Sequence, residues 1–271
     1  MEQKENATPM EHVIPTGQQV VGDTLKWIGF DLDDTLHFYR KASGQACEAV
    51  FQYLYEEFGA PPATLRAKYG GILKTAQSGS FAEGKTSRDY RAERFGKLLA
   101  AFSIIPYRHL EAVLDLYDEA LSRNLKLKEG ARETFLAARA SGLRIMVVSE
   151  GPHDAQEATL ARLGIAPLVD LLVTSAAERT SKRGGLLKIA LGRAQCLPHE
   201  LIYVGDSLEN DIWPAQELGV QAIYVGEEPV PACVVKIPSL LALEGLLNTS
   251  VRKAAVPQQA GHPHPDHRSL L

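Results

Sequence analysis

The sequence has few cysteines and no long apolar run. Its three cysteines, Cys47, Cys196 and Cys233, lie far apart in 271 residues and lack the spacing of metal ligands. This argues against a disulfide-built secreted domain and predicts reduced thiols in a cytosolic protein. No stretch approaches the roughly 18 apolar residues of a membrane span, and the N-terminal residues lack the basic and apolar regions of a signal peptide. We therefore expect a cytoplasmic protein with no membrane partner.

A strong excess of charge is also absent. The formal net charge of −4 gives no reason to expect a broad nucleic-acid-binding surface, so we expect no nucleic acid polymer as a partner. Charged residues make up 23% and hydrophobic residues 45% of the chain, near the average of globular proteins, which argues against global disorder. The length suits one large domain or two smaller ones.

Short apolar runs recur along the chain, with helical patterns between the later ones. The runs are rich in Val, Ile and Leu and do not alternate with polar residues, as expected for parallel strands buried on both faces. They cover 25–32, 143–149, 168–175, 201–207 and 221–226, and helices are expected at about 130–141, 152–164, 185–195 and 211–218. This alternation of strand and helix predicts an α/β protein with a Rossmann-like parallel sheet.

The segment between the first two apolar runs is more than a hundred residues long and shows no convincing strand. Apolar residues recur every four positions from Ala46 to Phe58, and a second apolar stripe runs from Leu110 to Leu121, so both stretches are expected to be helical. The expected organisation is an all-helical cap at 38–128, an α/β core of 23–37 and 129–250, and disordered tails at 1–22 and 251–271.

Carboxylates gather where the first apolar run ends. In "DLDDTL", Asp31 and Asp33 lie two positions apart, so on an extended strand they share a face. Two bare anions so close repel each other. A divalent cation would compensate their charge, and oxygen ligands favour Mg²⁺; alternatively, Asp33 carries a proton as a general acid would. A solvated turn is a further alternative, because Asp and Thr are common in turns.

The fourth apolar run also ends in a carboxylate. Asp206 directly follows Gly205 and is a natural second metal ligand, and Asp211 lies five positions later. Asp211 comes at the start of an expected helix, so it either supports the site or only caps that helix.

The second and third runs are followed by groups that could bind an anion. The second ends in Ser149, whose hydroxyl could donate hydrogen bonds together with the backbone amides that follow, those of Glu150 and Gly151. Lys182 follows the third run and either contributes an ammonium group or is simply solvated. Carboxyl ends of parallel strands meet at one edge of a sheet, so these groups are expected on one rim.

In order and spacing these motifs resemble those of the haloacid dehalogenase-like hydrolase superfamily with a helical cap of the first type (subfamily I), over about residues 26–230. The five residues from Asp31 to Thr35 match its Asp-x-Asp-x-Thr motif, and "GDSLEND" matches its fourth motif. Ser149 and Lys182 match the second and third motifs by position. The chain departs from the family where Glu150 replaces the frequent Asn and Arg183 the frequent Pro; a competing lysine, Lys188, lies too close to Asp206.

The resemblance implies a Mg²⁺-dependent phosphatase that hydrolyses a small phosphorylated metabolite, such as a nucleoside monophosphate or a sugar phosphate, through an aspartyl-phosphate. Asp31 is implied as the nucleophile and Asp33 as the general acid and then base. The implied metal site comprises Asp31, the backbone carbonyl of Asp33, and Asp206. The implied phosphate-binding residues are Ser149, Glu150, Gly151 and Lys182, supported by Thr35 and Asp211.

The resemblance also bears on the alternatives. Dehalogenases of this superfamily lack an Asp at the position of Asp33 and need no metal, so its presence points to phosphate chemistry. A phosphomutase and a non-catalytic relative that binds a phosphorylated ligand remain alternatives. In the cap, Arg88, Arg91 and Arg94 could share a helix face, which either binds an anionic substrate or faces solvent.

Overall fold

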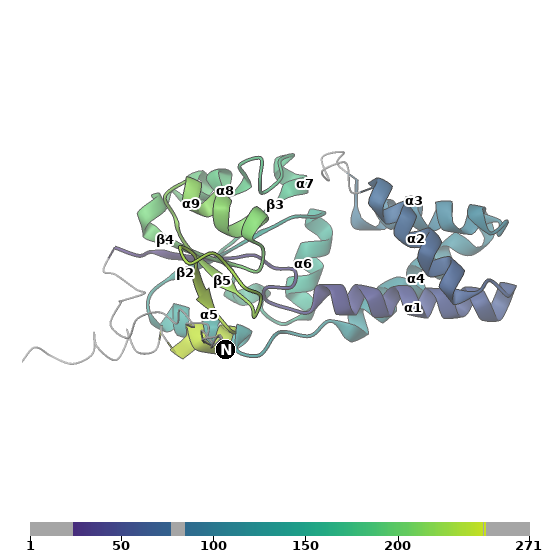
Figure 1. Ribbon diagram of the computed structural model, residues 1–271, viewed down its shortest axis with the longest axis horizontal. Coiled ribbons are helices and arrows are strands. Elements are labelled where there is room, and N and C mark those ends of the chain that lie inside the picture. The colour runs from purple at the N-terminus through teal and green to yellow at the C-terminus, as the bar shows by residue number, and fades with distance from the viewer. Residues whose placement is uncertain (1–23, 77–84, 246, 248–271) are drawn as a thin grey trace, which may run out of the picture.

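The computed structural model describes residues 24–76, 85–245 and 247, so both expected tails lie outside the described residues. A six-stranded parallel sheet in the order β3-β2-β1-β4-β5-β6 forms its centre (Figure 1). The strands are β1 (Trp27–Phe30), β2 (Arg144–Ser149), β3 (Leu171–Thr174), β4 (Leu201–Gly205), β5 (Gln221–Val225) and β6 (Val235–Ile237). The predicted Rossmann-like α/β fold is confirmed.

All five expected strands are present, and β6 is an additional one. Strand β1 is central: Trp27 pairs with Arg144 of β2 on one side and with Leu201 of β4 on the other. Its residues are all buried, as the unbroken apolar run predicted. The third strand begins later than expected, at Leu171, and a short 3₁₀ helix, Ala166–Leu168, precedes it.

Helices cover both faces of the sheet. They are α5 (Ala131–Ala140), α6 (His153–Arg162), α7 (Ser175–Glu178), α8 (Leu186–Ala194) and α9 (Trp213–Glu217). Phe135 of α5 packs with Phe30 on one face, whereas Leu187 of α8 packs with the cluster that contains Tyr203 on the other. No helix within 24–76 and 85–245 is both long enough and apolar enough to cross a membrane.

Between β1 and α5 the chain forms a helical insertion (Figure 1), which has its own apolar core. It consists of α1 (Tyr39–Phe58), α2 (Pro62–Ala76), α3 (Ser87–Ala101) and α4 (Pro106–Asn124). The four-residue repeat of α1 places Ala46, Val50 and Leu54 in this core, but Phe58 at its end is 38% exposed. Gly59 ends the helix in the left-handed conformation, with φ of 70°.

The chain enters and leaves the helical insertion through two adjacent segments. The Phe38 amide donates to the Lys126 carbonyl at 3.1 Å, and the Lys128 amide donates to the Leu36 carbonyl at 2.9 Å. Between them His37 forms a β-bridge with Leu127. The two ends of the insertion therefore lie side by side, next to the carboxyl end of β1. A second contact joins it to the core, where the Ser87 hydroxyl of α3 donates to the Asp154 carboxylate of α6 at 2.7 Å.

Candidate active site

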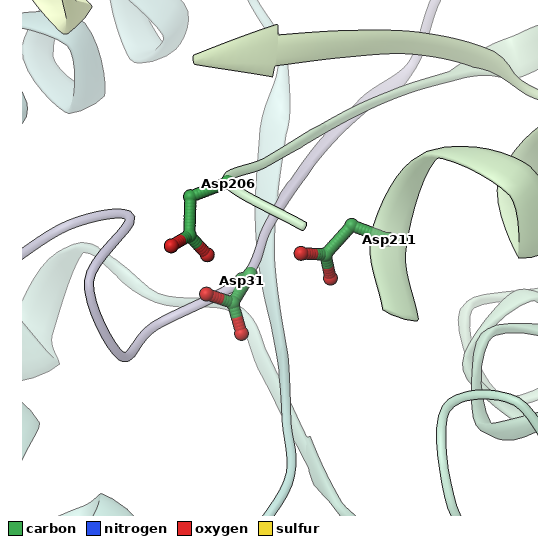
Figure 2. Close-up of side chains that lie close together, drawn as sticks. All are labelled: Asp31, Asp206 and Asp211. Atoms are coloured by element: carbon green, nitrogen blue, oxygen red, sulfur yellow. The ribbon is translucent and has the colours of Figure 1, made fainter. Parts of the chain in front are cut away.

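The carboxyl ends of β1 and β4 bring Asp31 and Asp206 together. Each follows its strand directly, and the Asp31 amide continues the ladder by donating to the Val204 carbonyl at 2.9 Å. Oxygens of Asp31, Asp206 and Asp211 all lie within 4.8 Å of one another (Figure 2). The hydroxyl of Thr35, which is fully buried, lies 3.3 Å from Oδ1 of Asp206 and donates to it.

Asp211 is not a capping residue, although the sequence left that alternative open. The N-cap of the short π-helix Leu208–Ile212 is Ser207, whose hydroxyl accepts from the Asn210 amide. The Asp211 carboxylate instead accepts from the Ser207 amide at 3.1 Å and from Lys182 Nζ at 2.7 Å. A Cβ at Gly205 would lie 2.4 Å from the Asp211 side chain, so only glycine allows this approach.

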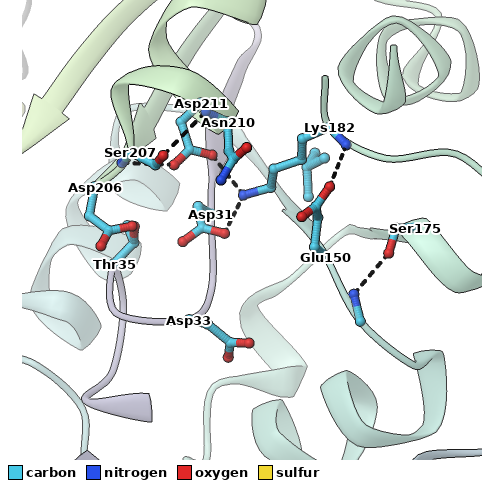
Figure 3. A network of polar contacts seen from close by, with 12 residues as sticks. Asp31, Asp33, Thr35, Glu150, Ser175, Lys182, Asp206, Ser207, Asn210 and Asp211 are labelled. Atoms are coloured by element: carbon cyan, nitrogen blue, oxygen red, sulfur yellow. Dashed lines mark hydrogen bonds and ion pairs between the residues drawn. The ribbon is translucent and has the colours of Figure 1, made fainter. Parts of the chain in front are cut away.

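Lys182 is the lysine that the structure brings to the site. Its ammonium group forms ion pairs with Asp31 and with Asp211, and its side chain is 5% exposed (Figure 3). Burial alone would lower the pKa of Lys182, but the charges of Asp211 and Asp31 outweigh it and hold the pKa well above its ordinary value. The competing Lys188 is exposed on α8, whereas Lys182 is buried.

The two residues that depart from the family pattern do not disturb this lysine. The Glu150 carboxylate accepts a hydrogen bond from the Lys182 amide at 2.8 Å and so anchors the loop that carries the lysine (Figure 3). Arg183 points to the surface, where it pairs with Glu209 at 3.1 Å. The sequence suggested that the Gly151 amide could donate to a bound anion. In the structure this amide donates to Ser175 Oγ at 2.9 Å.

Ser149 ends β2 with a hydroxyl that lacks a partner. The residue is fully buried, and its Oγ has no hydrogen-bond partner among the described residues. It lines a pocket of about 160 Å³ that also contains Asp31, Lys182 and Asp206. A buried hydroxyl without a partner costs free energy, and an anionic oxygen in this pocket would remove that cost.

Asp33 lies beside the acidic cluster rather than within it. Its carboxylate points away from Lys182 and Asp206 (Figure 3) and accepts hydrogen bonds from His37 at 2.9 Å and Gln156 at 3.3 Å. Burial raises the pKa of Asp33, and the hydrogen bond from His37 works against that rise. A raised pKa suits a group that carries a proton for part of a reaction. The expected metal contact of Asp33 through its backbone carbonyl stays a prediction.

The donor set of the acidic cluster fits a hard divalent cation. It consists of carboxylate oxygens, which Mg²⁺ prefers. Burial and the charge of Asp31 raise the pKa of Asp206. Burial also raises the pKa of Asp211, to about 7, against the effect of Lys182. These shifts express the cost of holding several carboxylates together, and a divalent cation would offset that cost.

Arg88 and Arg91 of α3 form ion pairs within the helical insertion. Arg88 forms ion pairs with three carboxylates of α4, those of Glu111, Asp115 and Asp118. Arg91 pairs with Asp118 at 2.7 Å and lies over the Tyr117 ring. Two of the three arginines therefore join α3 to α4. The sequence suggested only substrate binding or exposure to solvent for them.

The sequence did not assign roles to His37 and Gln156, although both contact Asp33. His37 is fully buried, whereas Phe38 beside it is 44% exposed. The one signal for His37 was its distance of four residues from Asp33. Gln156 is 123 residues from Asp33, and no sequence pattern connects the two.

The chain belongs to the haloacid dehalogenase-like hydrolase family, whose model matches residues 25–219. It is 34% identical over 211 residues to a glyceraldehyde 3-phosphate phosphatase of Methanocaldococcus jannaschii, covering 74% of this chain and 85% of that protein. It is 26% identical over 223 residues to haloacid dehalogenase-like hydrolase domain-containing protein 3 of Xenopus laevis, covering 79% and 90%. The crystal structure of a phosphatase of this family from Thermococcus onnurineus superposes with a TM-score of 0.61 at 21% identity, covering 82% and 98%.

Proposed function

We propose that the protein is a Mg²⁺-dependent phosphatase that hydrolyses a small phosphorylated metabolite through an aspartyl-phosphate on Asp31. The observation that carries this proposal is the pocket in which Asp31 meets Lys182, the unpartnered hydroxyl of Ser149, and Asp206. The relative named as a glyceraldehyde 3-phosphate phosphatase supports a phosphate ester as substrate. Triose phosphates, other sugar phosphates and nucleoside monophosphates therefore come first in a substrate panel.

In this reaction Asp31 attacks the phosphorus atom. Lys182 donates to Oδ1 of Asp31 and so fixes the orientation of the attacking carboxylate. The bond from phosphorus to the leaving oxygen breaks, and Asp33 gives that oxygen its proton. A water molecule then attacks the phosphorus atom and gives a proton to Asp33. The bond to Asp31 breaks, and the Asp31 carboxylate and inorganic phosphate are released.

The remaining residues bind and orient the phosphoryl group. Lys182 and Ser149 would contact its oxygens, and Asp211 holds the Lys182 ammonium in place. Bound Mg²⁺, held by Asp31, the carbonyl of Asp33, and Asp206, would offset the negative charge of the phosphoryl group. In this proposal the segment 38–128 is the cap over the core of 23–37 and 129–250, and it selects the substrate.

Hydrolysis of p-nitrophenyl phosphate tests the proposed activity directly. We expect turnover with Mg²⁺, loss of turnover with EDTA, and recovery when Mg²⁺ is restored. The single charge of Lys182 cannot offset three carboxylates and an anionic substrate, so a divalent cation is needed as well. The rate of p-nitrophenol release is the measurement. An absence of turnover with this ester and with the whole substrate panel would leave a non-catalytic phosphate-binding protein.

Asp33→Asn should affect esters according to their leaving groups. Phosphoryl transfer from an aryl phosphate should continue, because Asp31 remains and nitrophenol leaves without a proton. Transfer from alkyl phosphates should fall by roughly 10²–10⁴, the usual contribution of a general acid. The values of kcat/KM for both ester types measure this difference. An equal loss for both would show that Asp33 acts on the structure and not as an acid.

A further inference from the structure

Two side chains from different parts of the chain hold the carboxylate of Asp33. His37 is fully buried, and its Nε2 lies 2.9 Å from Oδ1 of Asp33. Its other ring nitrogen, Nδ1, has no partner in the part of the chain that the structure describes. A buried N–H without an acceptor costs more than a bare lone pair, so the proton belongs on Nε2, and the ring donates to Asp33.

Gln156 contacts the second oxygen. It lies in the first turn of α6, is 4% exposed, and donates from Nε2 to Oδ2 of Asp33 at 3.3 Å and to the Glu150 carbonyl at 3.1 Å. A Cβ at Gly151 would lie 2.8 Å from that nitrogen, so the glycine leaves the amide room to reach Asp33. Each oxygen of Asp33 therefore has one donor.

The backbone of His37 is held in place by its neighbours. It forms bridges with Asp33 and with Leu127, so the main chain that carries the ring is held by both segments that connect the helical insertion to the sheet. The shorter hydrogen bond, at 2.9 Å, fixes Oδ1, whereas the longer one, at 3.3 Å, leaves Oδ2 more weakly held. Oδ2 is thus the oxygen better suited to carry a proton.

We propose that His37 and Gln156 are positioning residues that orient the Asp33 carboxylate for proton transfer to the leaving group. His37 sets the orientation through Oδ1, and Gln156 limits rotation about the Cβ–Cγ bond while leaving Oδ2 able to release a proton. The inference rests on the proposed phosphatase function. It assigns to these two residues a part of the acid catalysis that Asp33 supplies.

The test is the ratio of kcat/KM for an alkyl phosphate that the wild-type protein turns over to kcat/KM for p-nitrophenyl phosphate. Both values cover only the steps up to release of the alcohol, and their ratio does not depend on the fraction of folded protein. His37→Leu removes the donor and should lower the ratio about 10- to 100-fold, part of the full effect of a general acid. His37→Gln places an amide N–H near the position of Nε2 and should recover most of the wild-type ratio.

Gln156→Met removes the weaker donor and should lower the ratio several-fold. This variant retains His37, so it carries the test even if His37→Leu fails to fold. The control is His109→Leu, where the ring contacts Phe58 edge-on at the far end of α1, about 30 Å along that helix from the site. We expect its ratio to equal that of the wild-type protein.

The outcomes separate this inference from the function on which it rests. A wild-type ratio in His37→Leu and Gln156→Met would overturn the positioning role, provided that Asp33→Asn lowers the ratio. Equal ratios in His37→Leu and His37→Gln would also overturn it, because the hydrogen bond would then have no effect. If the wild-type protein hydrolyses no phosphate ester at all, the proposed function fails, and the positioning role fails with it.

Discussion

Asp31→Asn should reduce turnover of every phosphate ester to background. The amide keeps the shape of the side chain, and its oxygen can still accept from Lys182, but it is a poor nucleophile and a weaker metal ligand. Removal of a nucleophile elsewhere costs on the order of 10⁶-fold in kcat, so the expected rate lies below detection. Steady-state assays with p-nitrophenyl phosphate measure the loss, and circular dichroism with thermal unfolding shows whether the fold is retained.

A matched variant separates the loss of the nucleophile from the loss of a charge. Asp115→Asn makes the same change on α4, where the side chain is 71% exposed, and should leave turnover unchanged. Mass spectrometry of Asp31→Asn excludes deamidation back to aspartate. Near-normal turnover in a sample without deamidation would mean that no phosphate is carried on Asp31, and the covalent reaction would have to be abandoned.

Lys182→Met should abolish useful turnover and also destabilise the protein. The side chain lies between two buried carboxylates, and its removal leaves Asp31 and Asp211 without their cation. Breaking a buried ion pair in this way costs about 3–5 kcal/mol of the free energy of unfolding. Loss of a group that stabilises charge in the transition state typically lowers kcat by about 10²–10³. Urea unfolding in the absence of Mg²⁺ measures the first effect and ester hydrolysis the second.

A double variant distinguishes the two effects of this lysine. Lys182→Met combined with Asp211→Leu removes both members of one buried pair, so it should be more stable than Lys182→Met alone and equally inactive. The control Lys188→Met changes an exposed lysine of α8 and should shift stability by no more than about 0.5 kcal/mol. Full stability in Lys182→Met would contradict the pairing seen in the structure.

The sheet was predictable because buried parallel strands have a simple signature. Five unbroken runs of Val, Ile and Leu marked the first five strands, but β6 is only three residues long and lies shortly after Pro231. Helix α2 was not recognised, because Gly70 and Gly71 lie within it and interrupted the helical pattern. Both failures concern elements whose formation depends on packing with the rest of the protein more than on local sequence.

The site was predictable as far as strand order determines it. Asp31, Ser149, Lys182 and Asp206 lie at or after successive strand ends, so the topology of the sheet brings them to one rim. The partners of these residues were not predictable. Gln156 approaches Asp33 because of how α6 packs, and the Asp211 carboxylate turns inward because a π-helix precedes α9. These are tertiary effects without a sequence period.

The paired attachment of the helical insertion makes it a module of the chain. Since the hydrogen bonds between Leu36–Phe38 and Lys126–Lys128 hold its two ends side by side, the insertion is joined to the chain as a closed loop between β1 and β2. Each doubling of a loop's length adds only about 0.6 kcal/mol of closure cost. The size and composition of the insertion can therefore diverge widely between relatives while strand order, register and the rim of carboxylates stay the same.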